Sequence, residues 1–257
     1  MKLILNADDF GLTESVNLAI VDCIKAGVVK STTVMMNQPG TAHAAALNAQ
    51  GLIPDVGLHF TLTSGKPIAE PSLIPSLVDA SGCFYDRATL FNKPDICPKE
   101  VVIELKAQYQ AALDAGFEIN HIDSHHFAGA FRALKIGFTE GINEIGLPAR
   151  RIDNVVLGQE MLRSATPDAF GMGFYAEGAT LEHLKAMLTA YKHKMPTGVV
   201  ELMCHPATEV TEELCAVSGY RQQRVDEWEI LTSRTLKEWL ETNQIQCIGF
   251  NDIASND

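Results

Sequence analysis

The sequence predicts an α/β fold, a single barrel-like domain built around about seven parallel strands. Short apolar runs alternate with longer helical patterns along the chain, which is the order expected of a parallel sheet with crossover helices. A length of 257 residues is also usual for one α/β barrel, although it would accommodate two small domains. Hydrophobic residues make up 46% of the chain and charged residues 20%, so a full core can form.

The first quarter of the chain has the pattern βαβαβ. Strands are predicted at residues 3–6, 32–36 and 56–60, and helices at 13–25 and 42–50. Gly27 and Gly51 follow these two helices, where a left-handed residue commonly ends a helix.

A longer helix is predicted between Pro98, a residue favoured in the first helical turn, and Gly116. Val101, Leu105 and Ala112 fall on one face of this helix. Further strands are predicted at residues 119–124, 149–152, 199–204 and 245–250, and further helices at 133–145, 181–193 and 221–242.

Two long segments interrupt the alternation, at residues 61–97 and 154–180. The first carries four prolines and the second four glycines, and loops of this length in a compact domain are usually functional or disordered. Because both follow predicted strands, we expect them at the carboxyl rim of the barrel, over the site, within one catalytic domain spanning residues 1–257.

Charge and cysteine content exclude several classes of partner. The formal charge is -12, from 20 Lys+Arg against 32 Asp+Glu, and no basic stripe offsets it, so neither nucleic acid nor an anionic membrane surface is expected to bind. Six cysteines occur without a CxxC pair, which is typical of reduced thiols in a cytosolic protein. Without a signal peptide or an 18-residue apolar stretch, the chain is predicted to be soluble and cytoplasmic.

Acids and imidazoles gather where the predicted strands end. Asp8 and Asp9 close the first strand, His59 lies near the end of the third, His125 follows the fourth, and His205 follows the run VVELMC. The carboxyl ends of parallel strands meet at one rim. Burying an unpaired carboxylate is costly, so this gathering indicates a bound cation.

Strand geometry refines this expectation. Residues two apart on a strand share a face, so Asp123 and His125 are predicted to lie on one side. Asp8 and Asp9 would point to opposite faces in mid-strand. Both can reach one pocket only at a strand end, where Gly11 permits a turn.

Each residue taken alone has an ordinary structural alternative. His59 could be a hydrogen-bonded core histidine, and Asp9 could be the N-cap of the first helix. Together, however, one carboxylate and two imidazoles could hold a divalent cation. Such a site would leave coordination positions open and leave the second acid free to take a proton.

Several motifs also resemble a known family, the YdjC-like carbohydrate deacetylases, whose best-studied members remove an acetyl group from chitooligosaccharides. They are NADDFG (6–11), STTVMMN (31–37), GLHFTLT (57–63), HIDSHH (121–126), RID (151–153) and MCHP (203–206). The resemblance implies a deformed TIM-like (β/α) barrel, in agreement with the alternation of elements.

The resemblance also implies roles for individual residues. Asp9, His59 and His125 would be the metal ligands, Asp8 the general base and His205 a candidate general acid. In such a mechanism a metal activates water and polarises the carbonyl, Asp8 accepts the proton of the water, and His205 protonates the leaving amine.

Two further residues are predicted to bind substrate, Asp123 and Arg151. The guanidinium of Arg151 could hold Asp8 ionised or clamp the substrate, and the alternative is a structural ion pair with Asp153. One departure from the family pattern concerns specificity: where many members have further histidines, this chain continues with Phe127-Ala128-Gly129.

The sequence is compatible with more than one metal and more than one reaction. Magnesium is implied by the resemblance, whereas imidazole ligands favour zinc or another divalent transition metal. The expected reaction is removal of an acetyl group from small N-acetylated sugars such as chitooligosaccharides or their phosphates, by an enzyme that could form a homodimer. The alternatives are a metal-dependent phosphoesterase, with Arg150 and Arg151 holding phosphate, and a non-catalytic sugar-sensing barrel.

Overall fold

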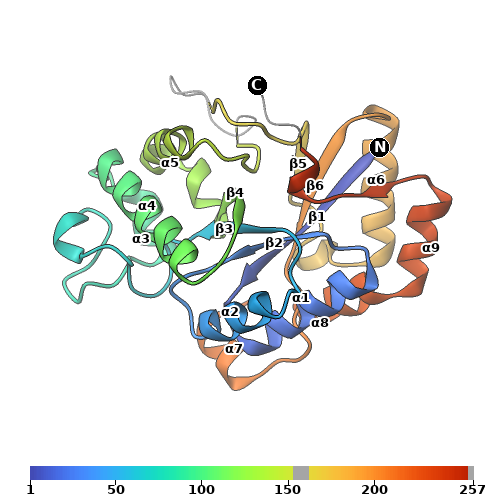
Figure 1. The fold of residues 1–257 in the computed structure, drawn as a ribbon, viewed down its shortest axis with the longest axis horizontal. Coiled ribbons are helices and arrows are strands. Elements are labelled where there is room, and N and C mark those ends of the chain that lie inside the picture. Colours follow the sequence, from blue (N-terminus) through green and yellow to red (C-terminus); the bar gives the residue numbers. More distant parts are fainter. Residues whose placement is uncertain (153–161, 254–257) are drawn as a thin grey trace.

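The fold is known from a computed structural model that describes residues 1–152 and 162–253. Seven strands form one parallel sheet in the order β4-β3-β2-β1-β6-β5, and β7 pairs with the first residues of β1 (Figure 1). The strands are β1 (Lys2–Phe10), β2 (Ser31–Val34), β3 (Val56–Phe60), β4 (Ile119–Ser124), β5 (Ala169–Gly171), β6 (Val199–Cys204) and β7 (Gln246–Cys247). The sheet curves into a half-barrel with β4 and β5 at its two edges, which confirms the predicted α/β barrel-like class.

Helices surround this sheet. They are α1 (Glu14–Ala26), α2 (Thr41–Ala49), α3 (Arg87–Asn92), α4 (Pro98–Asp114), α5 (Arg132–Ile145), α6 (Leu181–Lys194), α7 (Glu212–Val217), α8 (Gln222–Thr232) and α9 (Arg234–Thr242), with short 3-10 turns η1 (Pro71–Leu73), η2 (His125–Ala130), η3 (Ala176–Gly178) and η4 (Phe250–Asp252). In Figure 1, α4 and α5 lie at one end of the molecule and α6 and α9 at the other, while α1, α2 and α8 run along one side.

The central strand β1 carries polar side chains that are buried near its carboxyl end. It pairs with β6 from Lys2 to Ala7 on one side and with β2 from Asn6 to Phe10 on the other. From Leu3 onward every residue of β1 is buried. Polar side chains near its carboxyl end therefore lie inside the protein and need partners there.

Helices α4 and α5 approach each other closely through glycine. A Cβ atom on Gly137 would lie 2.3 Å from the carbonyl oxygen of Pro98 and 2.7 Å from Cβ of Val101. A second contact joins the layers, because Phe138 of α5 stacks on Phe60 of β3 with 5.9 Å between the ring centroids. These contacts hold α5 against β3, next to the β4 edge of the sheet.

Several predicted elements differ from the structure. The strand predicted at 245–250 is limited to β7 (Gln246–Cys247) and is followed by η4 (Phe250–Asp252). Residues 149–152 form only a bridge to β4, at Ala149, and β5 was not expected. The helix predicted at 221–242 is two helices, because Ser233 adopts an extended conformation and its side chain accepts a hydrogen bond from the Leu236 N–H as the N-cap of α9.

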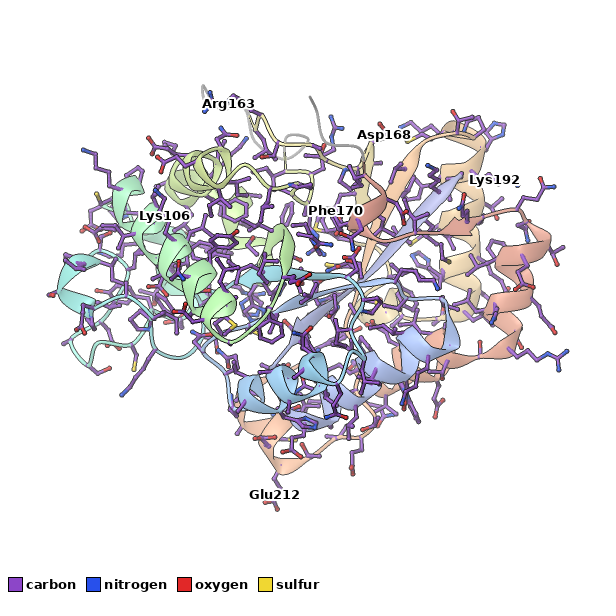
Figure 2. All side chains as sticks on the ribbon, viewed as in Figure 1. Lys106, Arg163, Asp168, Phe170, Lys192 and Glu212 are labelled. Carbon is purple, nitrogen blue, oxygen red and sulfur yellow. The ribbon has the colours of Figure 1, made fainter. Side chains whose placement is uncertain are left out.

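The two long segments contain short elements of their own. Residues 61–97 contain η1 and α3, and residues 162–180 contain β5 and η3, while residues 154–161 of the second segment lie outside the described part of the chain. Charged side chains such as Lys106 on α4 and Glu212 on α7 project from the outside of the molecule, whereas Phe170 on β5 is buried near the middle of the view (Figure 2). Among the described helices, none combines the length and apolarity needed to cross a bilayer.

Candidate active site

A cavity of about 600 Å³ lies at the carboxyl ends of the strands. The ends of β1, β3, β4 and β6 contribute to its wall, and so do both long rim segments. The polar and aromatic residues that line it include Asp8, Asp9, His59, His125, His126, His205, Arg87, Arg150, Arg224, Tyr175 and Tyr220. Five of the seven site residues predicted from the sequence are among them.

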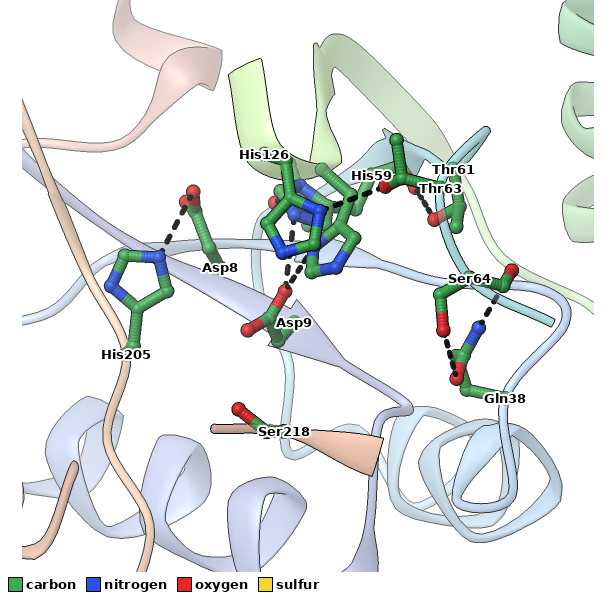
Figure 3. A network of polar contacts seen from close by, with 12 residues as sticks. Asp8, Asp9, Gln38, His59, Thr61, Thr63, Ser64, His126, His205 and Ser218 are labelled. Atoms are coloured by element: carbon green, nitrogen blue, oxygen red, sulfur yellow. Dashed lines mark hydrogen bonds and ion pairs between the residues drawn. The ribbon is translucent and has the colours of Figure 1, made fainter. Parts of the chain in front are cut away.

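The backbone at Asp9 explains how two adjacent acids reach one cavity. Asp9 has a φ of 70°, in the left-handed region, and the β1–β2 register shifts between Ala7 and Phe10. This local twist brings Asp8 and Asp9 to the same cavity (Figure 3). The sequence analysis assigned the turn to Gly11, which is also left-handed with a φ of 94°, but the change of direction already begins at Asp9.

Asp9, His59 and His125 form a compact group of potential metal ligands. Oδ1 of Asp9 lies 3.2 Å from Nε2 of His59 and 2.9 Å from Nδ1 of His125, and the ligand atoms of all three lie within 4.8 Å of one another. Burial by itself would raise the pKa of Asp9, but Arg224 and His125 outweigh it and hold that pKa well below its usual range. An ionised carboxylate and two imidazoles thus converge, a donor set that fits a divalent cation.

Asp123 lies behind His59. Its Oδ1 is 2.6 Å from Nδ1 of His59, and its Oδ2 accepts a hydrogen bond from Thr33 at 3.1 Å and is 3.0 Å from Nη1 of Arg150. With 1% of its surface exposed, Asp123 is not part of the cavity wall, where the sequence analysis placed it as a substrate-binding residue. Its contact instead fixes the His59 ring so that Nε2 faces Asp9.

Arg150 holds the second acid. Its Nη1 and Nη2 donate to the two oxygens of Asp8 at 2.8 and 2.7 Å, and its Nε donates to Glu201 at 2.7 Å. Burial would raise the pKa of Asp8, but the guanidinium of Arg150 outweighs this and lowers it to about 2. Asp8 is therefore ionised at neutral pH.

Arg151 is the arginine predicted from the sequence to hold Asp8, but in the structure Arg150 makes this contact. The Arg150 N–H donates to the carbonyl of Ile122 beside β4, and successive residues of such an extended segment point in opposite directions. Arg151 consequently turns away from the cavity and donates to the backbone carbonyls of Pro167 and Asp168. Asp153, its alternative partner, lies outside the described residues.

His205 faces Asp8 across the cavity (Figure 3). Nε2 of His205 is 3.8 Å from Oδ2 of Asp8, and the backbone N–H of His205 donates to Glu227 at 2.5 Å. Burial lowers the pKa of His205 to about 4, partly offset by Asp8. The imidazole is therefore neutral at pH 7.

The segment that departs from the family pattern forms η2, directly after β4. His126 and Phe127 have φ values of 56° and 53°, and the ring of His126 is 2.8 Å from the hydroxyl of Thr63 on the opposite rim segment. A Cβ atom on Gly129 would lie 2.3 Å from the Phe138 ring. The altered residues therefore pack η2 against α5 while His126 and Phe127 still line the cavity.

Sequence reasoning missed three charged residues of the site. Glu201 had a signal, since it is a lone acid inside the apolar run VVELMC. Arg150 was considered only as a phosphate ligand. Arg224, whose Nη2 donates to Oδ2 of Asp9 at 2.6 Å, belongs to an unremarkable helical segment 215 residues further along the chain and had none.

The chain resembles known proteins over nearly its whole length. The YdjC-like protein family model matches residues 2–242. The chain is 35% identical to a carbohydrate deacetylase of Thermoanaerobacter pseudethanolicus, covering 97% of this chain and 98% of the relative. It is 36% identical to a carbohydrate deacetylase of Listeria monocytogenes, covering 98% and 100%. A crystal structure from Enterococcus faecalis, described as a proposed cellobiose-phosphate cleavage protein, superposes with a TM-score of 0.87 at 32% identity, covering 97% of both chains.

Proposed function

The chain belongs to the YdjC-like protein family, and from this membership and the geometry of the cavity we propose that it is a metal-dependent carbohydrate deacetylase. The observation that carries the proposal is the group Asp9, His59 and His125 beside the ionised Asp8. Hydrolysis of an N-acetyl group needs an activated water, a stabilised oxyanion and a protonated leaving amine, and these residues together with His205 can serve each need.

Asp9, His59 and His125 are the proposed metal ligands. When bound, a divalent cation supplies a Lewis acid for the acetyl carbonyl and lowers the pKa of water. Two imidazoles and one carboxylate favour zinc or another transition metal, whereas magnesium, implied by the family resemblance, prefers oxygen ligands. Metal analysis of the purified protein, followed by reconstitution of the stripped protein with each ion, decides between them.

Asp8 is the proposed general base. Arg150 keeps its carboxylate ionised, so it can accept the proton of the attacking water. His205 is neutral at pH 7 and can act as an acid only after it takes up a proton. Since its Nε2 lies 3.8 Å from Asp8, we infer that the proton moves from Asp8 through His205 to the departing amine.

The proposed substrates are N-acetylated sugars such as chitooligosaccharides or their phosphates. A cavity of about 600 Å³ is within the range that holds drug-sized ligands. Arg87 supports the phosphorylated form, because this exposed arginine of α3 lines the cavity and forms no ion pair within the described part of the chain. Its guanidinium is suited to a phosphate group.

Phosphoester hydrolysis is the second candidate, favoured by Arg87 and by the description of the Enterococcus faecalis protein as a proposed cellobiose-phosphate cleavage protein. Acetate and phosphate release from diacetylchitobiose and its phosphate, measured on metal-loaded protein, separates the two. Acetate release that Asp8→Asn abolishes supports deacetylation. Phosphate release without acetate selects the second reaction, and Arg87→Ala should weaken activity only on the phosphorylated sugar.

A further inference from the structure

Two stacked tyrosines form one wall of the cavity. The rings of Tyr175 and Tyr220 lie face to face, with 4.3 Å between centroids and 17° between planes. Both line the cavity, but they are not equally covered, since Tyr175 remains 41% exposed. The part of the Tyr175 ring that Tyr220 leaves uncovered is open to a ligand in the cavity.

The hydroxyl of Tyr220 forms hydrogen bonds that hold this ring in place. The hydroxyl of Tyr220 donates to Oε1 of the buried Glu227 at 2.6 Å and accepts from the backbone N–H of Ala176 at 3.0 Å. Ala176 has a φ of 54°, a strained conformation that follows directly on Tyr175. Tyr220 therefore holds both the Tyr175 ring and the backbone at Ala176 in place.

The two tyrosines lie beside His205, the residue proposed to protonate the leaving amine. The ring of His205 meets Tyr175 nearly edge-on, with 5.4 Å between centroids and 67° between planes, and it meets Tyr220 at 5.8 Å and 75°. Glu227 joins the two parts, since its other oxygen accepts the backbone N–H of His205. A ligand stacked on Tyr175 would therefore lie next to the His205 ring.

We propose that Tyr175, supported by Tyr220 and Glu227, is the platform on which the apolar C–H face of a pyranose ring stacks while its N-acetyl group meets His205 and Asp8. The inference rests on the proposed function for the identity of the sugar, but the platform itself requires only sugar binding. A flat aromatic face selects for the flat, apolar face of a pyranose over an acyclic amide of the same charge. Tyr175 is accordingly a substrate-positioning residue.

Sugar binding without turnover tests the platform. Diacetylchitobiose is titrated calorimetrically into metal-stripped wild type, Tyr175→Ala, Tyr175→Phe and Phe131→Ala. Phe131 is the matched control, because it is 38% exposed and stacks on Phe91 but lies outside the cavity wall. We expect Tyr175→Ala to weaken binding about 10-fold, because the variant has no ring for the sugar to stack on, and the other two variants to bind within about 2-fold of wild type.

Kinetics of the metal-loaded proteins give the second measurement. Tyr175→Ala should raise KM by the same factor and leave kcat within about 2-fold, since the ring binds ground state and transition state alike. Unchanged sugar affinity in Tyr175→Ala, a fall in kcat at constant KM, or no sugar binding by the wild type would each overturn the platform. Sugar binding that depends on Tyr175 without acetate release would instead overturn the deacetylation and leave the platform in place.

Discussion

Replacing Arg150 by methionine removes a cation that contacts three buried acidic side chains. Asp8, Asp123 and Glu201 all lie within 3.0 Å of the Arg150 guanidinium, and Arg150 itself is 2% exposed. Methionine fills similar volume without charge. The substitution therefore leaves the acids buried without their shared counter-ion, rather than creating a cavity.

The size of the effect follows from the burial. Breaking a buried ion pair by removing one partner destabilises a protein by about 3 to 5 kcal/mol. For a chain of this length each kcal/mol shifts Tm by about 2 to 4 °C, so Arg150→Met is expected to lower Tm by about 6 to 20 °C. Without Arg150, burial raises the pKa of Asp8, and its carboxylate loses the two hydrogen bonds that hold it in place, so acetate release is also expected to fall.

Arg151→Met is the matched control, since it removes the same charge from the next residue, where the side chain contacts the carbonyls of Pro167 and Asp168. Thermal unfolding by circular dichroism and acetate release, measured on both variants, check the prediction. We expect Arg151→Met to shift Tm far less than Arg150→Met. Equal shifts, or a shift below about 2 °C for Arg150→Met, would refute the role given to the buried cluster.

Three further outcomes are expected. Burial raises the pKa of Glu201 from 4.5 to about 7, partly offset by Arg150, so the unfolded chain loses this proton first and wild-type stability falls as the pH rises from 4.5 through 7. Glu201→Gln has no such proton to lose, so the difference between its Tm and that of wild type should increase from pH 5 to pH 8 in thermal scans. His125→Ala should weaken divalent-metal binding by about 100-fold or more in competition with a chelator, while the circular dichroism spectrum is unchanged; unaltered affinity would exclude His125 as a ligand. Gly137→Ala should destabilise the protein by about 1 to 3 kcal/mol in urea unfolding, despite the better helix propensity of alanine, because its Cβ atom meets the Pro98 carbonyl.

The order of strands and helices could be predicted because hydrophobic periodicity is local. β1, β3, β4 and β6 lie where apolar runs occur, and the residues that end them share one rim. β5 escaped prediction because three residues ending in glycine carry no periodic signal, and it exists only through pairing with β6. The break at Ser233 is a competition between continuing a helix and capping the next one, which composition alone does not decide.

The site could be predicted only as far as strand ends determine it. Asp9, His59 and His125 converge because their strands are parallel and lie in one sheet. The choice between Arg150 and Arg151 depends on which face of an extended segment turns inward, and a one-residue difference reverses it. Arg224 reaches Asp9 from α8, and such a contact is set by the packing of a helix that the strand pattern does not place.

The left-handed backbone of Asp9 has a practical bearing on how the two adjacent acids should be studied. At Asp8, alanine changes the side chain alone. At Asp9, alanine would remove the carboxylate and would also place a residue that disfavours a φ of 70° near the end of β1. A loss of function could then come from the missing carboxylate or from the strained backbone. Asparagine tolerates this conformation and keeps the shape of the side chain, which makes it the informative substitution for a knockout at this position.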